Sequence, residues 1–425
     1  MDESWKIETR AVQCGYEPGN GDPRIAPIVQ STTYKYDTAQ QVADLFDLKA
    51  PGFFYSRLAN PTVEVFEKKI AAMEGGVAAV ATSAGQTANA IAILNICTCG
   101  EHFIAVSSLY GGTVSLFTNT FKKMGVQVTY VDPEASEEDI RKVFRPNTKA
   151  IFAEAVANPA MIVLDFDKFA GIAREFDVPL IVDNTFPSPV LCRPFELGAN
   201  IVTHSSTKYL DGHATSVGGV IVEGGNYNWA NGKFREFVEP DPSYHGLIYA
   251  EAFKECPFSV KARVQWLRDF GCIMAPQNAW LTNLGMETLH VRIPRHCSNA
   301  LALAEFLEKH PKVAWVNYPG LKSNKYYERA LKYMPNGVGG VLTFGVKGGR
   351  KEGEIVMDSL KLAAIVVHVC DVRTGVLHPA SMTHRQLSDA EQAAAGVTPD
   401  LIRVTVGLEN IEDICKDFDQ ALNKI

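Results

Sequence analysis

Two short apolar runs end abruptly in polar side chains: Asn200-Ile-Val-Thr-His-Ser-Ser-Thr-Lys208 and, upstream of it, Leu180-Ile-Val-Asp183. Short apolar runs with polar ends are typical of buried parallel strands that stop at the rim of a sheet. The interval between the runs suits a strand, a connection and the next strand. We therefore expect Asp183 and Lys208 to project from the ends of neighbouring strands.

A carboxylate and an amine in this arrangement suit pyridoxal phosphate (PLP). The lysine can form a Schiff base, the carboxylate can keep the pyridine nitrogen protonated, and nearby hydroxyls can bind the phosphate. The hydroxyls here are those of Ser205, Ser206 and Thr207, directly before Lys208. An isolated lysine after a strand is usually an ordinary surface residue, so this interpretation depends on the rest of the chain.

Composition limits the class of protein. A chain of 425 residues with 46% hydrophobic residues can bury a large core and is expected to form two or three domains. The net charge of −7 and the lack of a long basic run argue against nucleic-acid binding. We find no signal peptide and no run of 18 apolar residues, and the nine cysteines lack paired metal-ligand spacing. We expect a soluble cytoplasmic protein with free thiols and no metal.

Residues 1–60 are rich in proline, glycine and tyrosine, show little periodicity, and are predicted to hold little regular structure. We interpret them as an arm that lies over a neighbouring subunit. Tyr55 and Arg57 are two residues apart, so an extended backbone would place them on one face, where a phenol and a guanidinium suit a phosphate. Residues 61–260 are predicted to form a large domain and residues 261–425 a smaller one.

From Asn60 onward, helical and strand patterns alternate, which predicts a mostly parallel sheet covered on both faces. Gly85 lies in a small-residue turn between a strand and a helix, where free N–H groups and the helix dipole can bind a phosphate. Ligand groups gather at the carboxyl ends of such strands. The suitable residues at the predicted ends are Tyr110, Asn158, Asp183, Ser205, Thr207 and Lys208.

Other nucleotide and metal classes lack their motifs. No G-x-G-x-x-G follows the first strand and no G-x-x-x-x-G-K-[ST] occurs, so dinucleotide and ATP sites lack their glycine scaffold. The histidines occur singly in unrelated contexts, which argues against a metal hydrolase.

The chain resembles the Cys/Met-metabolism class of fold-type I PLP enzymes along nearly its whole length, and within it the O-acetylhomoserine sulfhydrylases. The motifs that carry the resemblance are Tyr55-Ser-Arg57, Ser83-Ala-Gly85-Gln86, Ser108-Leu-Tyr110, Glu154 to Asn158-Pro, Val182-Asp183-Asn-Thr-Phe, His204-Ser205-Ser-Thr207-Lys208, Glu239-Pro-Asp-Pro-Ser-Tyr-His245, His378-Pro-Ala-Ser and Leu401-Ile-Arg403. The resemblance implies an α/β fold with an N-terminal arm, a large domain built on a mostly parallel seven-stranded-type sheet, and a smaller α+β C-terminal domain. It also implies a homotetramer assembled as a dimer of dimers.

The resemblance implies a role for each site residue. Lys208 would carry the cofactor and move protons, and Asp183 would pair with the pyridine nitrogen. Tyr110 would stack on the ring and also act as an acid or base, so the resemblance makes Lys208, Tyr110 and Asp183 the catalytic residues. Asn158 would also contact the cofactor, and Gly85, Gln86, Ser205 and Thr207 would bind the phosphate. Tyr55 and Arg57 would join them from another subunit. Arg403 would hold the substrate carboxylate, assisted by Thr374 and Tyr55.

The implied reaction is γ-replacement on O-acetyl-L-homoserine, with sulfide giving homocysteine or methanethiol giving methionine. Three residues, Cys370, Gly375 and Met382, depart from the family pattern and bear on substrate choice. We expect Gly375 to remove bulk beside the substrate carboxylate and to permit unusual backbone angles. The stretch Ser381-Met382-Thr383-His384 resembles methionine γ-lyases. The alternatives are γ-elimination of methionine or cystathionine to 2-oxobutyrate and replacement with another nucleophile. A non-catalytic homologue is disfavoured because Lys208 is present.

Overall fold

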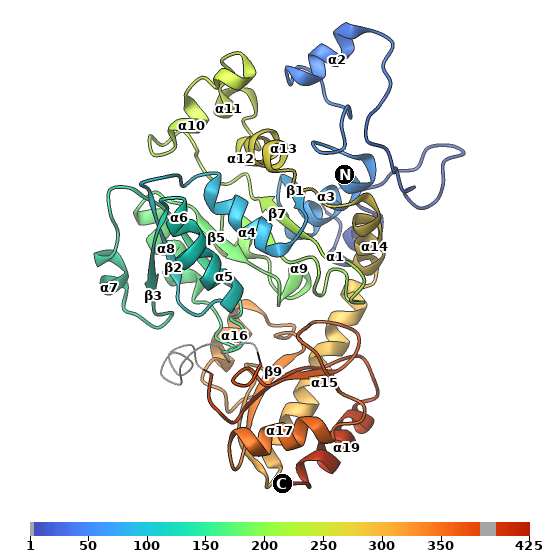
Figure 1. The fold of residues 1–425 in the computed structure, drawn as a ribbon, viewed down its shortest axis with the longest axis vertical. Coiled ribbons are helices and arrows are strands. Elements are labelled where there is room, and N and C mark those ends of the chain that lie inside the picture. Colours follow the sequence, from blue (N-terminus) through green and yellow to red (C-terminus); the bar gives the residue numbers. More distant parts are fainter. Residues whose placement is uncertain (1–3, 383–396) are drawn as a thin grey trace.

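Two β-sheets organise the molecule (Figure 1). The computed structural model describes residues 4–382 and 397–425. A seven-stranded sheet lies within residues 78–223 and a five-stranded sheet within residues 313–405, nearer the C-terminus. The predicted α/β fold, with a large mostly parallel sheet and a smaller second sheet domain, is confirmed. The boundaries at residues 60 and 260 stay a prediction.

The large sheet has the strand order β1-β7-β6-β5-β4-β2-β3. Its strands are β1 (Ala78–Thr82), β2 (His102–Val106), β3 (Gln127–Val131), β4 (Thr148–Glu154), β5 (Leu180–Asp183), β6 (Ile201–His204) and β7 (Gly219–Glu223). β7 runs antiparallel to both β1 and β6, while the other pairs are parallel. β5 and β6 pair directly, with Asp183 opposite Thr203, so Asp183 and Lys208 follow the ends of neighbouring strands as predicted.

Helices cover both faces of this sheet. Alternate residues of β5 and β6 enter two different cores: Val182 and Val202 pack in one, Ile181 and Ile201 in the other. α8 (Phe166–Glu175) contributes to the first core and α4 (Gly85–Leu94) to the second. Strands buried on both faces explain the continuous apolar runs in the sequence. The remaining helices of this part are α5 (Gly111–Ser115), α6 (Phe121–Lys123), α7 (Glu137–Lys142), α9 (Ser188–Leu191), α10 (Arg235–Val238), α11 (Tyr249–Ala252), α12 (Pro257–Lys261) and α13 (Arg268–Phe270).

The N-terminal arm contains more regular structure than predicted. It forms α1 (Ile7–Gln13) and α2 (Ala39–Phe46), and α2 projects away from the body in Figure 1. α2 forms because Thr38 and Gln41 make a reciprocal capping box at its start, a local signal that the lack of longer periodicity hid. α3 (Pro61–Glu74) begins after the Asn60 cap and ends at Gly75, as the sequence indicates.

The small sheet has the order β10-β11-β12-β9-β8. Its strands are β8 (Val313–Asn317), β9 (Val341–Val346), β10 (Ala364–Ile365), β11 (Gly375–Leu377) and β12 (Leu401–Thr405), and its helices include α14 (Pro276–Glu287), α15 (Leu289–Lys309), α16 (Tyr327–Tyr333), α17 (Arg350–Ser359) and α19 (Ile411–Leu422). α15 continues through Pro294, because residues before and after the proline bury one face in the core. None of the helices in the described part is apolar over a length sufficient to cross a bilayer.

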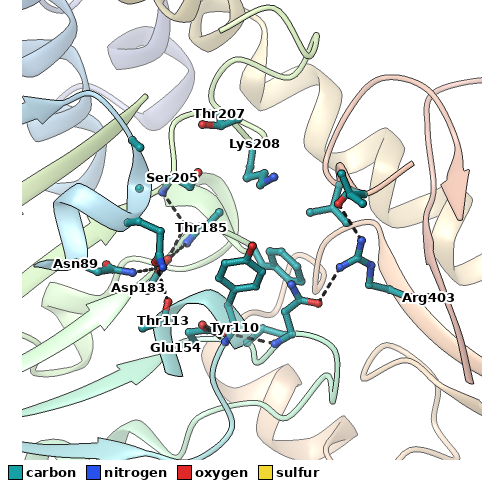
Figure 2. A pocket seen from close by; sticks show the side chains of 18 residues that line it. Asn89, Tyr110, Thr113, Glu154, Asp183, Thr185, Ser205, Thr207, Lys208 and Arg403 are labelled. Carbon is teal, nitrogen blue, oxygen red and sulfur yellow. Dashed lines mark hydrogen bonds between the residues drawn. The ribbon is translucent and has the colours of Figure 1, made fainter. Parts of the chain in front are cut away.

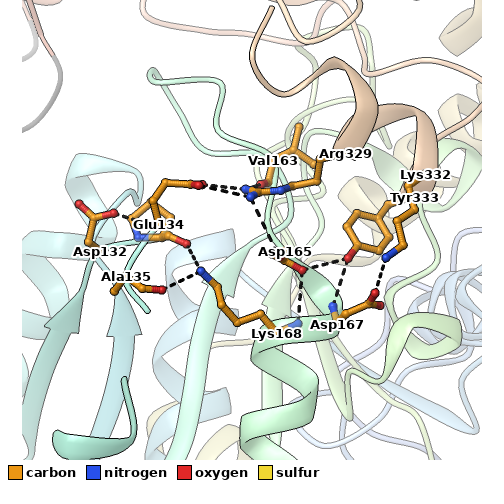
Figure 3. A network of polar contacts seen from close by, with 11 residues as sticks. Asp132, Glu134, Ala135, Val163, Asp165, Asp167, Lys168, Arg329, Lys332 and Tyr333 are labelled. Atoms are coloured by element: carbon orange, nitrogen blue, oxygen red, sulfur yellow. Dashed lines mark hydrogen bonds and ion pairs between the residues drawn. The ribbon is translucent and has the colours of Figure 1, made fainter. Parts of the chain in front are cut away.

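A polar network ties α16 to the start of α8 (Figure 3). Arg329 donates to Glu134 Oε1 at 2.7 Å, and the Tyr333 hydroxyl donates to Asp165 Oδ1 at 3.0 Å. Lys332 pairs with Asp167. These contacts link a helix beside the small sheet to a helix beside the large sheet. On the small sheet, β12 carries Arg403, which lines the same cavity as the strand ends of the large sheet.

Candidate active site

One cavity collects most of the predicted site residues from both sheets (Figure 2). It lies where β5, β6 and the N-terminus of α4 meet the small sheet. The predicted residues that line it are Gly85, Gln86, Tyr110, Asn158, Asp183, Ser205, Thr207, Lys208 and Arg403. The chain therefore brings together residues that are far apart in sequence.

Asp183 is held by neutral donors. Its Oδ2 accepts from Asn89 Nδ2 at 3.0 Å, and its Oδ1 accepts from the backbone N–H of Thr185 at 3.0 Å and from the Thr185 hydroxyl at 2.5 Å. Asn89 is fixed in turn by the buried Thr203 hydroxyl, which donates to Asn89 Oδ1 at 2.6 Å. These donors fix the orientation of the Asp183 carboxylate, which can accept a hydrogen bond from a protonated ring nitrogen.

The N-terminus of α4 provides the anion-binding end of the cavity. Its N-cap, Ala84, offers no side-chain hydrogen bond to the first-turn N–H groups, so these groups remain available to a ligand. A Cβ added at Gly85 would lie 2.5 Å from Ser205 Cβ and 2.7 Å from Ser205 Cα, so only glycine fits this close approach. Gln86 Oε1 accepts from the Thr113 hydroxyl at 3.1 Å, which orients the Gln86 side chain.

Lys208 and Arg403 are the two basic residues that line the cavity. Burial lowers the pKa of Lys208, and the Arg403 charge lowers that pKa further. Arg403 is 6% exposed, and burial lowers the pKa of its guanidinium to about 10. The guanidinium donates to Asn158 Oδ1 at 3.3 Å and to the Val367 carbonyl at 3.2 Å, while its Nε has no partner among the described residues. A buried cation with only neutral partners is a suitable receptor for a carboxylate.

Tyr110 presents its ring to the cavity and is 50% exposed. Its backbone N–H donates to Glu154 Oε1 at 2.7 Å. A Cβ at Gly112 would approach the Tyr110 ring to 2.5 Å, so the glycine leaves room for the ring. Burial, and secondarily the Asp183 charge, raises the pKa of Glu154 well above its ordinary value. Through its hydrogen bond to the Tyr110 N–H, Glu154 fixes the backbone that carries the Tyr110 ring.

Three predicted residues lie outside the cavity of this chain. Tyr55 is partly exposed on the arm, with the Arg57 guanidinium 5.1 Å from its ring centroid. Arg57 donates to the Arg268 carbonyl. The Thr374 hydroxyl donates to Glu409 Oε2 at 2.9 Å and accepts from the Gly407 N–H. The site roles of these three residues stay predictions.

The departures from the family pattern have specific positions. Gly375 lies in β11 opposite Thr405, without a positive φ, and a Cβ there would meet Val366 at 2.6 Å. The expectation of unusual backbone angles is therefore wrong for Gly375, which makes room for Val366. Its place beside the carboxylate site stays a prediction. Met382 donates its N–H to the His378 carbonyl in a turn, away from the cavity lining. Thr383 and His384 lie outside the described residues.

Several contacts of the site were not predicted from the sequence. Asn89 and Thr185 hold Asp183, Glu154 holds Tyr110, and His368 Nδ1 lies 3.4 Å from Lys208 Nζ. Glu154 and Thr185 fall inside the motifs that carry the resemblance, and Asn89 is a polar residue between two alanines of α4. These were the available signals.

The residues present fit PLP. The cradle at Gly85 suits a phosphate at a helix N-terminus, and the Asp183 carboxylate suits a pyridinium. The buried Lys208 amine is suited to a Schiff base, and the incompletely partnered Arg403 is suited to a substrate carboxylate. One cavity therefore contains a complementary group for each end of the cofactor and for an amino acid.

Comparisons with known proteins agree with this chemistry. Residues 8–423 match the model of the family described as Cys/Met metabolism PLP-dependent enzyme. The chain is 47% identical to O-acetyl-L-homoserine sulfhydrylase of Leptospira meyeri, with 100% of this chain and 98% of the relative covered. It is 45% identical to homocysteine synthase of Schizosaccharomyces pombe, with 99% of each covered.

A solved structure from Campylobacter jejuni is also similar. It is described as a putative O-acetylhomoserine (thiol)-lyase carrying N′-pyridoxyl-lysine-5′-monophosphate. It superposes with a TM-score of 0.95 at 36% identity, over 99% of this chain and 100% of that chain. The family match covers nearly the whole sequence, and the cavity contains the groups that the cofactor requires. The chain belongs to the Cys/Met metabolism family of PLP-dependent enzymes.

Proposed function

We propose that this enzyme catalyses γ-replacement on O-acetyl-L-homoserine, in which hydrosulfide displaces acetate and L-homocysteine forms. Methanethiol in place of sulfide would give methionine. The observation that carries the proposal is Arg403, a buried guanidinium with neutral partners only, facing the same cavity as Lys208 and Asp183. The names of the relatives support O-acetylhomoserine as the amino acid that this guanidinium binds.

Each proposed role uses a property of the chain. When bound, PLP acts as an electron sink for negative charge that develops on the substrate carbons. Asp183 keeps the ring nitrogen protonated; two unit charges about 4 Å apart at an effective dielectric near 20 attract by roughly 4 kcal/mol. Lys208 Nζ removes the substrate α-proton and later returns a proton, because its lowered pKa increases the fraction of neutral amine. Arg403 binds the substrate carboxylate and thereby orients the amino acid.

The remaining roles concern the cofactor. Gly85, Gln86, Ser205 and Thr207 bind the phosphate, together with the first-turn N–H groups of α4. The Tyr110 ring would stack on the cofactor, which is favourable by roughly 0.5–1.5 kcal/mol beyond area burial. Asn158, whose Oδ1 accepts from Arg403, would also contact the cofactor and so link the cofactor and carboxylate sites.

We further propose that the enzyme is a homo-oligomer, a homotetramer in its complete form. Tyr55 and Arg57 lie on the arm outside the cavity of their own chain and carry groups suited to a phosphate. A mixing experiment tests this assembly. Arg57→Ala and Lys208→Ala proteins are each expected to be inactive, and co-refolded mixtures are expected to recover part of the activity through sites that combine two intact halves. Mixtures that stay inactive would contradict a shared site.

We also propose a cytoplasmic location. All nine cysteines are free, including the exposed Cys99, which suits a reducing compartment. Cell fractionation with an antibody against the chain tests this proposal, and recovery in an oxidising compartment would contradict it.

A paired assay tests the reaction. One sample of PLP-loaded protein receives O-acetylhomoserine and sulfide, and the other receives methionine alone. We expect homocysteine in the first sample and little 2-oxobutyrate in the second. Rapid formation of 2-oxobutyrate from methionine would identify a γ-lyase instead. Replacing the acetyl ester by succinyl and phosphoryl esters in the first sample identifies the acyl group.

A further inference from the structure

His368 contacts the amine of Lys208 from the small domain. The distance from Lys208 Nζ to His368 Nδ1 is 3.4 Å, and His368 is the one side chain in the described part of the molecule recorded within hydrogen-bonding distance of that amine. The backbone on each side of His368 is fixed. Val366 donates its N–H to the Val376 carbonyl at 3.1 Å, and Cys370 donates its N–H to the Thr405 hydroxyl at 2.7 Å. The imidazole is therefore held beside Lys208 by the small sheet.

The second ring nitrogen is also informative. His368 Nε2 is buried and has no hydrogen-bond partner among the described residues. Burial lowers the pKa of His368, and the Lys208 charge lowers that pKa further. The imidazole is therefore neutral near pH 7, and a neutral imidazole with its proton on Nε2 has a free lone pair on Nδ1. That lone pair faces the Lys208 amine.

The charged groups around His368 act in both directions. Lys208 and Arg403 disfavour an imidazolium, whereas Asp371 and Asp211 favour it. A proton that moves from Lys208 to His368 exchanges one buried cation for another, so the charge of the pair is unchanged and no additional charge has to be desolvated.

The neighbouring thiol is not a competing base. Burial raises the pKa of Cys370 to about 12, so its sulfur stays protonated at neutral pH. Cys370 also adopts φ 67°, a left-handed conformation that favours glycine, and the Cys370 N–H holds the turn that follows His368. The geometry thus leaves the imidazole as the available acceptor for a proton on Lys208.

We propose that His368 is a positioning residue that accepts a proton from Lys208 and returns it during turnover. An N–H bond of the Lys208 ammonium breaks, its electron pair stays on Nζ, and the proton bonds to His368 Nδ1, giving an imidazolium and a neutral amine. The reverse transfer restores both groups, so protons balance and no other reactant is required. This inference rests on the proposed function only in that Lys208 carries the substrate proton.

Two substitutions separate positioning from proton transfer. His368→Asn keeps a hydrogen-bond acceptor and loses the titrating ring, whereas His368→Leu loses both. His310→Asn is the matched control, because His310 is also a buried histidine in the C-terminal part of the chain and follows the end of α15, outside the cavity. Thermal unfolding of all variants shows whether each one folds. If His368→Leu does not fold, the kinetic test with His368→Asn still decides whether His368 transfers a proton.

The first readout uses cofactor-free protein and does not depend on activity. The pH dependence of acetylation of Lys208 is measured by mass spectrometry of the peptide that contains it. Because an acceptor stabilises the ammonium, His368→Leu is expected to lower the midpoint for Lys208 by about half a pH unit or more, while His368→Asn changes it less. An unchanged midpoint in His368→Leu would refute the interaction between His368 and the Lys208 amine. This outcome does not depend on whether the proposed reaction is correct.

The second readout is the pH profile of kcat for the loaded enzyme. Protonation of His368 is expected to produce an acidic limb in the wild-type profile. In His368→Asn, kcat is expected to fall about 10²-fold, and that limb should be lost. The His310→Asn control should keep the wild-type profile. A His368→Asn enzyme that retains both kcat and the acidic limb would refute the proton transfer.

Discussion

Replacing Arg403 with leucine tests the assignment of the carboxylate site. Arg403 is 6% exposed, donates only to an amide oxygen and a backbone carbonyl, and has an unpartnered Nε. Charge-assisted hydrogen bonds contribute about 1.5–3 kcal/mol, and unit charges about 4 Å apart at a dielectric near 20 attract by roughly 4 kcal/mol. A loss of about 2–4 kcal/mol corresponds to a decrease in kcat/KM of roughly 30- to 10³-fold.

The assay is steady-state kinetics with O-acetylhomoserine and sulfide, accompanied by the visible spectrum of the bound cofactor. The spectrum is expected to remain, because Arg403 is assigned to the substrate. Arg373→Leu is the control, since Arg373 is an exposed arginine outside the cavity lining and pairs with Asp371. Because the Arg403 charge lowers the pKa of Lys208, Arg403→Leu should also shift the Lys208 limb of the pH profile to higher pH. A folded variant with kcat/KM within about threefold of wild type would refute the carboxylate site.

Three further substitutions test the cofactor site and its electrostatics. Lys208→Ala should remove turnover and the visible absorbance of the lysine-bound cofactor; retained turnover would contradict its central role. Gly85→Ala should weaken PLP binding at least tenfold (about 1.4 kcal/mol) in a fluorescence titration, because the new Cβ would lie 2.5 Å from Ser205 Cβ; Gly171→Ala, where space is open, should not. Burial raises the pKa of Glu154, so the folded state loses stability as the pH rises above the ordinary glutamate value of about 4.3. Glu154→Gln should therefore unfold at a higher temperature than wild type at pH 8, with a smaller difference at pH 5; the opposite order would refute the burial argument.

Features encoded by a few adjacent residues could be predicted from the sequence. The Asn60 cap and the Gly75 stop define α3, and the apolar runs before Asp183 and Lys208 define two neighbouring strands. These signals are local, and parallel strands bring their carboxyl ends together whatever connects them. The strand order at the site and most of the cavity lining follow from that geometry.

Contacts between distant segments could not be predicted in the same way. Asn89 reaches Asp183 across 94 residues of sequence, and His368 reaches Lys208 across 160. Both contacts depend on how α4 and the small sheet are seated against the strand ends. Gly375 shows the reverse error, because this glycine has no positive φ and makes room for Val366 instead of permitting unusual backbone angles.

The charges of the cavity indicate what it must bind. Asp183 and Glu154 accept hydrogen bonds from neutral donors, and Lys208 and Arg403 have no carboxylate partner in the described part of the chain. Buried charges without counter-charges are costly, and a fold that only needed stability would pair or remove them. Three of these groups instead match a charge or reactive group on the ligands: Asp183 a pyridinium, Arg403 a carboxylate, and Lys208 an aldehyde carbon, with the N-terminus of α4 left for a phosphate. The cofactor-free cavity is therefore electrostatically incomplete, and binding of PLP should raise the unfolding temperature most where Asp183 is intact and less in Asp183→Asn.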